Sequence, residues 1–569
     1  MRQMARSMPL AATLLIAACG GGGSGGGGSS PGYTVGGNVT GLVVNQLLTL
    51  QDNGTDPLIL QSDGAFTFSS KVPSGGNYSV TIAAQPTGGT CVVSHGSGTN
   101  VTADVSNVTV TCSADSYSLG GSLVGLAGGQ QVTLENNGAD SFTLTANGAF
   151  SFPTQVAYGS TYSITVSTQP SQASQQFCNV HNGTGIMSGA VTNVQVACDT
   201  ELVLYAFTGA GGDGSPNGRL LRDAVGNLYG TSAGTVFELS PAAGGGYTES
   251  VLYSTALAPS GGVIMDGAGN LYGTTQTGGS GSFGFVFKLT PAAGGYTESV
   301  LHAFDGSSID GGEPNGPLIM DSAGNLYGTT RVGGMNQTGI VFELSPAAGG
   351  GYAETILYTF SGGGDGAAPE AGLIMDGAGN LYGTTSGSLN SSDFGAVFKL
   401  MPAAGGGYTE QTLHVFTAAS DGAVPAGGLI MDSAGNLYGT TRLGSGNSGI
   451  GLGTVFKVSS SGGNYSVLYS FTGGIDGEQP VNGLVVDSAG NLYGTTDSGG
   501  GSANCNNGCG TVFELSPAGG RYTESLLFGF SGGSGGAGPG ALIIDAAGNL
   551  YGTSAGATNA GNVFEILQP

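Results

Sequence analysis

Aspartates followed by glycine recur through the C-terminal two-thirds of the chain, and they are its main candidates for ligand chemistry. A rim of carboxylates can bind Ca²⁺, which prefers oxygen ligands, or a cationic or hydroxyl-rich ligand. Asp-Gly is also a turn dipeptide, because the carboxylate accepts nearby backbone N–H groups and glycine adopts positive φ. Both interpretations, a binding rim and a set of turns, remain open. The aspartates are Asp213, Asp310, Asp365, Asp421 and Asp476.

A second set of aspartates belongs to the segment Asp-x-x-Gly-Asn-Leu-Tyr-Gly-Thr, which occurs seven times. The Asp-x-Asp-x-Asp-Gly spacing of calcium loops is absent. We therefore predict that this aspartate is a turn residue. Leu-Tyr-Gly-Thr favours packing between repeats over a sugar platform, since glycine marks a close approach of backbones. The tyrosines of the segment are Tyr229, Tyr272, Tyr327, Tyr382, Tyr438, Tyr493 and Tyr551.

The histidines offer little for catalysis. A nucleophile needs an adjacent base, and the repeats contain only His302 and His414. Both occupy a position where other copies carry Tyr253, Tyr358 and Tyr469, so we predict that they are packing residues. No Trp, nucleotide fingerprint or flavin fingerprint occurs. The chain is therefore predicted not to be an enzyme. The alternative is a polysaccharide hydrolase or lyase that uses paired carboxylates on the acidic face.

The elements that position these residues follow from the spacing of the tyrosines, which is 43 to 58 residues. Such a period, with short apolar runs and glycine turns, indicates a radial repeat architecture. One unit has four apolar runs, the content of one propeller blade. The runs are residues 372–376, 379–385, 396–400 and 408–416.

The order of the strands predicts how the ring closes. The third strand recurs seven times, but the chain stops at Pro569 without a seventh fourth strand. The missing copy stands first, at residues 201–207. We predict that it completes the last blade and removes the exposed edges. The expected fold of residues 200–569 is therefore a seven-bladed β-propeller within an all-β chain.

Loop position predicts a binding face. Turns between strands 1–2 and 3–4 lie on one side of an antiparallel blade, and the 2–3 and blade-to-blade loops lie on the other. The second set varies among repeats, and variation on a shared scaffold is where recognition usually resides. We predict that this variable face binds the partner. Besides the five Asp-Gly aspartates, the candidates on it are Arg331, Arg442 and Asp497.

The repeat unit resembles a known family. Gly-Leu-Ile-Met-Asp-x-Ala-Gly-Asn-Leu-Tyr-Gly-Thr-Thr, followed by Gly-x-Val-Phe-Glu-Leu-Ser-Pro, is similar to the GloVer tandem repeat of bacterial surface proteins. It also resembles NHL-type seven-bladed propeller repeats. The resemblance covers residues 201–569. It implies a β-propeller attached to the cell surface, and it implies no activity.

Residues 31–114 and 115–199 are two related modules. Ser-Asp-Gly-Ala-Phe-Thr-Phe at 62–68 corresponds to Ala-Asn-Gly-Ala-Phe-Ser-Phe at 146–152. Asp-Gly and Asn-Gly beside alternating aromatics are strong hairpin signals. We predict two small β-sandwiches, which look like immunoglobulin-like or carboxypeptidase-regulatory-like modules. The resemblance implies a spacer or binding role.

The N-terminal residues predict where in the cell the protein is located. Arg2 and Arg6 precede an apolar run at residues 8–18, too short to span a bilayer, so residues 1–18 are expected to be a signal peptide. Ile-Ala-Ala-Cys-Gly resembles the bacterial lipobox, which implies lipid on Cys19. Ordinary secretion is the alternative. Residues 19–30 are a Gly/Ser tether, and the glycine after Cys19 implies outer-membrane sorting.

The other six cysteines form an even set, which in an exported chain predicts disulfides. Zinc is disfavoured, because only four histidines occur and no Cys-x-x-Cys spacing accompanies them. The expected pairs are Cys91–Cys112, Cys178–Cys198 and Cys505–Cys509.

The charge excludes one class of partner. Net charge is −25 and only 11 residues are Lys or Arg, whereas nucleic-acid binding needs clustered cations. We therefore expect a monomeric cell-surface lipoprotein whose propeller binds a protein or a glycan. It would need no cofactor, with Ca²⁺ left open. A purely structural envelope protein is a further possibility.

Overall fold

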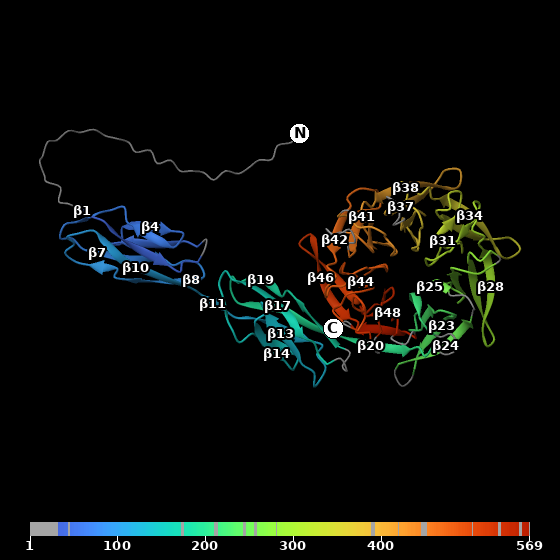
Figure 1. Ribbon diagram of the computed structural model, residues 1–569, viewed down its shortest axis with the longest axis horizontal. Coiled ribbons are helices and arrows are strands. Elements are labelled where there is room, and N and C mark those ends of the chain that lie inside the picture. The colour runs from blue at the N-terminus through green and yellow to red at the C-terminus, as the bar shows by residue number, and fades with distance from the viewer. Residues whose placement is uncertain are drawn as a thin grey trace. The chain divides into compact units, whose positions relative to one another are not determined.

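The computed structural model of this 569-residue chain describes residues 32–567, with short gaps. The gaps are 44–45, 172–175, 210–213, 243–245, 255–258, 280, 388–392, 419, 445–451, 503, 533–535 and 557–559. All regular structure in the described part is β (Figure 1). That part contains no helix long and apolar enough to cross a membrane. The expected signal peptide 1–18, Cys19, the tether 19–30 and Asp213 lie outside the described residues.

The chain divides into two compact units. One holds the residues up to 117 with 156–160 and 186–189, and the other holds 118–155, 161–185 and 190–569.

The first unit contains two four-stranded sheets that share one core. Alternate residues of each strand point inward, as in β3, where Leu48 and Leu50 are fully buried. They meet Val39 and Val108 from the other sheet in the same cluster. One sheet has the order β5 (Gly64–Thr67), β2 (Val35–Thr40), β10 (Val105–Ala114), β8 (Gly89–Ser94), and the other β4 (Asp56–Leu60), β3 (Leu48–Asp52), β7 (Tyr78–Ala84), β9 (Ser97–Gly98). Two short pairs complete the unit: β1 (Gly32–Tyr33) with β6 (Val72–Pro73), and β11 (Ser116–Tyr117) with β16 (Val156–Ala157).

The second unit begins with the same strand orders, so the internal duplication seen in the sequence extends to topology. In both copies the first long strand pairs in parallel with the last one, β2 with β10 and β12 with β20. One sheet has the order β15 (Gly148–Ser151), β12 (Leu119–Val124), β20 (Val191–Ala206), β18 (Gln176–His181), and the other β14 (Asp140–Leu144), β13 (Val132–Asn136), β17 (Thr161–Thr168), β19 (Thr184–Ile186).

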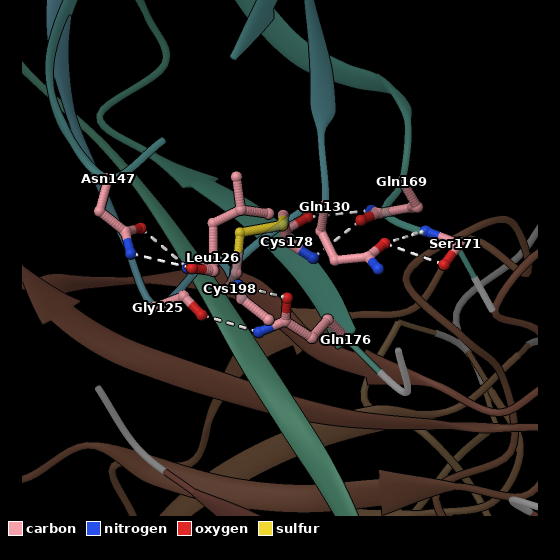
Figure 2. The surroundings of a disulfide bond; sticks show 10 residues. Gly125, Leu126, Gln130, Asn147, Gln169, Ser171, Gln176, Cys178 and Cys198 are labelled. Atoms are coloured by element: carbon pink, nitrogen blue, oxygen red, sulfur yellow. Dashed lines mark hydrogen bonds between the residues drawn. A yellow bond between two sulfur atoms is a disulfide. The ribbon is translucent and has the colours of Figure 1, made fainter. Parts of the chain in front are cut away.

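The three predicted disulfides are present. Cys91–Cys112 and Cys178–Cys198 each join neighbouring strands of one sheet at directly paired positions. An antibody-type disulfide joins the two sheets instead. A glutamine covers the backbone beside each of these bonds: Gln169 accepts the Cys178 N–H at 2.7 Å and donates to its carbonyl at 2.9 Å (Figure 2). A capped edge strand cannot pair with another chain at that point.

The repeats form four-stranded antiparallel units, arranged around a ring in Figure 1, with β44 and β48 toward the centre and β28, β34 and β38 at the periphery. The first units are β21 (Asn217–Arg222), β22 (Leu228–Thr231), β23 (Thr235–Pro241), β24 (Tyr247–Ser254); then β25 (Pro259–Met265), β26 (Leu271–Thr275), β27 (Phe285–Ala292), β28 (Gly295–Ala303); then β30 (Ile319–Met320), β31 (Leu326–Thr330), β33 (Ile340–Pro346), β34 (Tyr352–Thr359). A parallel contact of Arg219 in β21 with Gly262 in β25 joins the first two units into one eight-stranded sheet. Next come β35 (Ile374–Met375), β36 (Leu381–Thr385), β37 (Ala396–Pro402), β38 (Tyr408–Val415); β39 (Ile430–Met431), β40 (Asn436–Thr441), β41 (Thr454–Ser459), β42 (Ser466–Ser470); and β43 (Val485–Val486), β44 (Leu492–Thr496), β45 (Thr511–Ala518), β46 (Arg521–Gly529). A short pair, β29 (Gly311–Gly312) and β32 (Val332–Gly333), joins two loops.

The last unit is closed by a strand from the start of the repeats, as predicted. It consists of β47 (Ile543–Ile544), β48 (Leu550–Ser554), β49 (Asn562–Leu567) and β20. β20 pairs antiparallel with β49, with Glu201 opposite Ile566 and Val203 opposite Phe564. The same strand begins in the preceding sheet, so the expected boundary at 199/200 falls inside a continuous strand. The physical reason is that hydrogen bonds to both sheets keep its backbone extended throughout.

Pairs of phenylalanines hold neighbouring units together. Phe398 of β37 is fully buried and packs edge-on against Phe360, which follows β34, with ring centroids 5.0 Å apart. The glycine of Leu-Tyr-Gly-Thr makes room for this ring, because a Cβ on Gly383 would lie 2.5 Å from it. Equivalent edge-on pairs, 5.0–5.3 Å apart, are Phe207–Phe237, Phe304–Phe342, Phe416–Phe456, Phe471–Phe513 and Phe530–Phe564.

The repeated aspartate is a turn residue, as predicted. One oxygen of Asp376 accepts the N–H groups of Ala378 and Asn380 at 2.9 and 3.0 Å. The other accepts the Asn380 side chain at 2.7 Å and the Tyr382 hydroxyl at 2.9 Å. Burial opposes ionisation of Asp376, but these hydrogen bonds outweigh it and lower its pKa. Asp223, Asp266, Asp321, Asp432, Asp487 and Asp545 make the same four contacts.

The first threonine after Tyr-Gly links one unit to the next. Thr440 donates to the Asn482 carbonyl at 2.9 Å, whereas the equivalent Thr384 hydroxyl is buried without a partner. Thr440→Val should therefore lower the free energy of unfolding by about 1–2 kcal/mol, because it orphans a carbonyl. Thr384→Val should leave it unchanged or raise it. Urea unfolding of both variants tests this, and equal losses would contradict it.

Candidate functional site

A cavity of about 480 Å³ lies among the segments that enter the first strand of each repeat. Each segment lies between a recurring proline and a recurring Leu or Val. Because all repeats contribute to its wall, we call this space the axial cavity. Its lining includes Asn217, Gly218, Arg219, Ser260, Gly261, Asn315, Gly316, Pro317, Glu370, Ala371, Gly372, Val424, Ala426, Gly427, Gly428, Arg442, Val481, Asn482, Gly483 and Ala541.

Backbones of neighbouring repeats touch in the wall of this cavity. A Cβ on Gly218 would lie 2.4 Å from the Gly262 nitrogen, and one on Gly316 would lie 2.5 Å from the Gly372 nitrogen. Glycine is therefore required where the inner strands converge. The wall is mostly backbone, and its chemistry depends on the few positions that carry side chains.

Those side chains leave an excess of positive charge. The ionisable residues of the lining are Arg219, Arg442 and Glu370. Glu370 is paired with Arg331, whose Nε lies 2.9 Å from its carboxylate. Among the described residues neither Arg219 nor Arg442 has an acidic partner, although the Arg442 Nε donates to Gln479 at 3.3 Å.

Arg219 has an unusual environment. Its side chain is exposed to the cavity, yet the ring surrounds it, and this loss of hydration lowers its pKa. A guanidinium stays charged under such conditions. The charge is therefore available to a ligand in a protein whose net charge is −25.

The two sets of variable loops lie together, as predicted for the variable face. In the blade-to-blade loop, the Val424 N–H donates to the Phe394 carbonyl of one 2–3 loop at 2.9 Å. The Val424 carbonyl accepts from Arg442 of the next at 3.0 Å. Since Val424 and Arg442 also line the axial cavity, this face borders the cavity.

In these contacts between loops, the residue immediately before the recurring proline has a left-handed backbone conformation. Its φ is 53–56° at five non-glycine positions. Such residues are uncommon and concentrate at functional sites. In each case the N–H donates to the preceding 2–3 loop. The residues are Ser215, Glu313, Ala368, Val424 and Gln479.

The Asp-Gly aspartates stabilise their own loops. Asp365 accepts the Ser361 N–H at 2.8 Å and the Tyr358 hydroxyl at 3.0 Å, and Asp476 does the same with Thr472 and Tyr469. Burial opposes ionisation of Asp365, but its hydrogen bonds lower its pKa overall. Asp310, Asp365 and Asp476 are only 6–8% exposed, so an exposed acidic rim does not include them. At these three positions the aspartate is a turn residue and not part of an exposed binding rim.

The other predicted site residues lie in different surroundings. Asp421 is half-buried and accepts the Thr417 N–H at 3.0 Å. Arg331, Arg442 and Asp497 are exposed on the variable face, and Arg442 lines the cavity. The sequence reasoning missed Arg219. A proline that recurs in every repeat, followed by residues that vary, is the sequence signal that could have identified its segment.

His302 and His414 lie on the outer strands, away from the axial cavity lining. His414 stacks on Tyr465 with ring centroids 3.7 Å apart and an interplanar angle of 6°. Its Nε2 lies 3.3 Å from Asp421. The prediction that His414 is a packing residue agrees with these contacts.

A known repeat family matches most of the ring. The profile of the Gloeobacter/Verrucomicrobia repeat matches residues 232–452 and 406–569, which together span more than half of the chain. No curated protein matches this chain.

Several solved structures of other proteins align with part of this chain. A streptogramin B lyase is 14% identical and matches over 64% of this chain and 96% of its own, with a TM-score of 0.42. Virginiamycin B lyase from Staphylococcus aureus, with quinupristin, is 13% identical over 65% and 99%, with a TM-score of 0.43. The gluconolactonase XC5397 from Xanthomonas campestris is 15% identical over 65% and 90%, with a TM-score of 0.34.

Proposed function

Because this chain belongs to the Gloeobacter/Verrucomicrobia repeat family, we propose that its repeats form a seven-bladed β-propeller that acts as a binding module without catalysis. Each four-stranded unit is one blade, and β20 supplies the outer strand of the seventh. The preceding pairs of sheets are immunoglobulin-like spacers, with their disulfides moved into one sheet.

The proposed location of the protein is the bacterial cell surface. Lipid on Cys19 would anchor the chain to the outer membrane, and residues 19–30 would hold the folded part away from it. Three disulfides support an exported protein, since such bonds persist outside the cytoplasm.

The proposed ligand is the acidic end of a glycan, bound in the axial cavity. A cavity of about 480 Å³ lies within the range of small-ligand sites. The observation that carries the proposal is Arg219 in its wall, which has no acidic partner among the described residues, with Arg442 in the same lining. A guanidinium binds a carboxylate through two parallel hydrogen bonds, and it does so best where water is depleted.

We expect the full chain to bind digalacturonate more tightly than the neutral galactose disaccharide, as measured by isothermal titration calorimetry. Arg219→Gln should weaken digalacturonate binding at least tenfold, because a charge-assisted pair contributes about 1.5–3 kcal/mol. The control is Arg521→Gln, which removes the same charge from the exposed start of β46. Its affinity should equal that of the wild type.

Two results would overturn this assignment. One is equal affinity for the acidic and the neutral sugar, and the other is equal weakening by Arg219→Gln and Arg521→Gln. Release of reducing or unsaturated sugar ends during the titration would favour the polysaccharide-enzyme alternative, because a binding module releases none.

A further inference from the structure

A second candidate site lies on the outer edge of the ring, between the β25–β28 unit and the β30–β34 unit. His302 comes from β28, Asp310 from the following loop, and Glu354 from β34 of the next unit. One ligand atom from each lies within 4.8 Å of the other two. His302 Nε2 is 3.1 Å from an Asp310 oxygen and 3.6 Å from a Glu354 oxygen.

The repeats show what this position normally does. Tyr358 and Tyr469 occupy the place of His302, and each hydroxyl donates to the aspartate of its own loop. At His414 the third partner differs, because Tyr465 replaces the glutamate of the next unit and stacks on the imidazole. Among the described residues, only the interface at His302 combines histidine, aspartate and glutamate.

Asp310 does not need His302 or Glu354 in order to hold its own loop. Asp310 is already held by the Asp305 N–H at 2.8 Å and the Gly311 N–H at 2.7 Å. One oxygen of Glu354 is buried without any hydrogen-bond partner. Such an oxygen is costly to bury, and Glu524 at the same repeat position carries one too, so the feature that distinguishes this interface is His302 beside both carboxylates.

The separations fit a shared metal ion. Two ligand atoms that each lie about 2.0–2.1 Å from a tetrahedral Zn²⁺ are about 3.4 Å apart. The two measured separations, 3.1 and 3.6 Å, bracket that value. One imidazole and two carboxylates suit Zn²⁺ or Mn²⁺. Backbone donors fix the orientation of Asp310, as second-shell groups do at metal sites.

We propose that His302, Asp310 and Glu354 form a site for a divalent transition metal that joins these two units of the ring. The three side chains are 23%, 11% and 14% exposed, so an ion reaches the site from solvent and keeps a water-filled coordination position. The site is separate from the axial cavity and does not depend on the ligand bound there.

The test uses the untagged full chain, stripped with EDTA, and Zn²⁺ alone as the probe. Calorimetric titration should give one site with a Kd below about 10 µM, and Zn²⁺ should raise the melting temperature. His302→Tyr should weaken binding at least thirtyfold and abolish that rise. This variant installs the residue found at Tyr358 and Tyr469, so the hydrogen bond to the loop aspartate is retained.

His414→Tyr is the matched control, because it makes the same change at an interface without the glutamate. Its Zn²⁺ affinity should equal that of the wild type. Glu354→Gln should weaken binding about tenfold. The proposal is overturned if the wild type binds Zn²⁺ and Mn²⁺ no more tightly than about 100 µM. It is also overturned if His302→Tyr and His414→Tyr bind alike, since His302 would then be only an ion-pair partner of Asp310.

Discussion

Replacing Phe398 with alanine is expected to lower the free energy of unfolding by about 4 kcal/mol, the cost typical of a buried phenylalanine. Phe398 is fully buried, packs edge-on against Phe360 of the preceding unit and fills the space above Gly383. The inner glycine cannot move to fill the void, because its backbone pairs directly with that of Phe398. The loss therefore combines lost burial with a cavity that persists.

Urea unfolding followed by circular dichroism measures this change. Val415→Ala is the matched control, because Val415 lies beside the buried Phe416 on an outer strand and is 45% exposed. It should cost less than about 1 kcal/mol. A loss at Phe398 no larger than that at Val415 would mean that neighbouring units do not depend on the phenylalanine pairs.

The second large effect is a pH-dependent gain in stability on replacing Glu524 with glutamine. Burial, with a smaller contribution from Asp476, raises the pKa of Glu524 to about 8. One of its oxygens is buried without a partner. The nearby Tyr469 has a single hydroxyl proton, and it donates that proton to Asp476 at 2.9 Å.

The sign of the effect follows from the two states. Glutamate in the unfolded chain ionises with a pKa of about 4.3, well below its folded value, so the wild type loses stability as pH rises from about 4 through 8. Glutamine does not ionise. Glu524→Gln should therefore match the wild type near pH 4 and exceed it by on the order of 3 kcal/mol at pH 9.

Thermal unfolding at pH 4, 6 and 9 measures this crossover. Glu298 is the control, since it occupies the same repeat position but accepts the Tyr253 hydroxyl at 2.7 Å. Glu298→Gln should give no gain at pH 9. A constant difference between Glu524→Gln and the wild type across pH would contradict the assignment.

Strictly repeated features were predictable from the sequence. The Asp-x-x-Gly-Asn turn recurs with fixed spacing, and its chemistry is local, so Asp376 could be assigned without knowing the fold. The closing strand followed from counting strands, and the pairing of Glu201 with Ile566 confirms it. The sandwich cysteines were paired correctly because each pair is close in sequence and alone in its module.

Features that depend on the ring were not predictable. Asp310, Asp365 and Asp476 are buried, whereas Asp421 is half-buried, and the Asp-Gly dipeptide alone does not distinguish these cases. Arg219 follows a recurring glycine, but only convergence of the repeats on one axis shows that it enters a cavity. His302 and Glu354 are 52 residues apart, and they meet because the outer strands of neighbouring units lie side by side. A domain boundary was placed where the repeated motif begins, although β20 runs through it.

The continuity of β20 has a mechanical consequence. This strand of 16 residues belongs first to a sandwich sheet and then to the last sheet of the ring. If the N-terminus is anchored while the ring binds an external partner, tension acts along the axis of β20. It then loads the row of hydrogen bonds between β20 and β49 in shear, all together rather than one after another. The strand that enters the ring would thus resist such a load through hydrogen bonds that act together, and these are the same bonds that close the last unit.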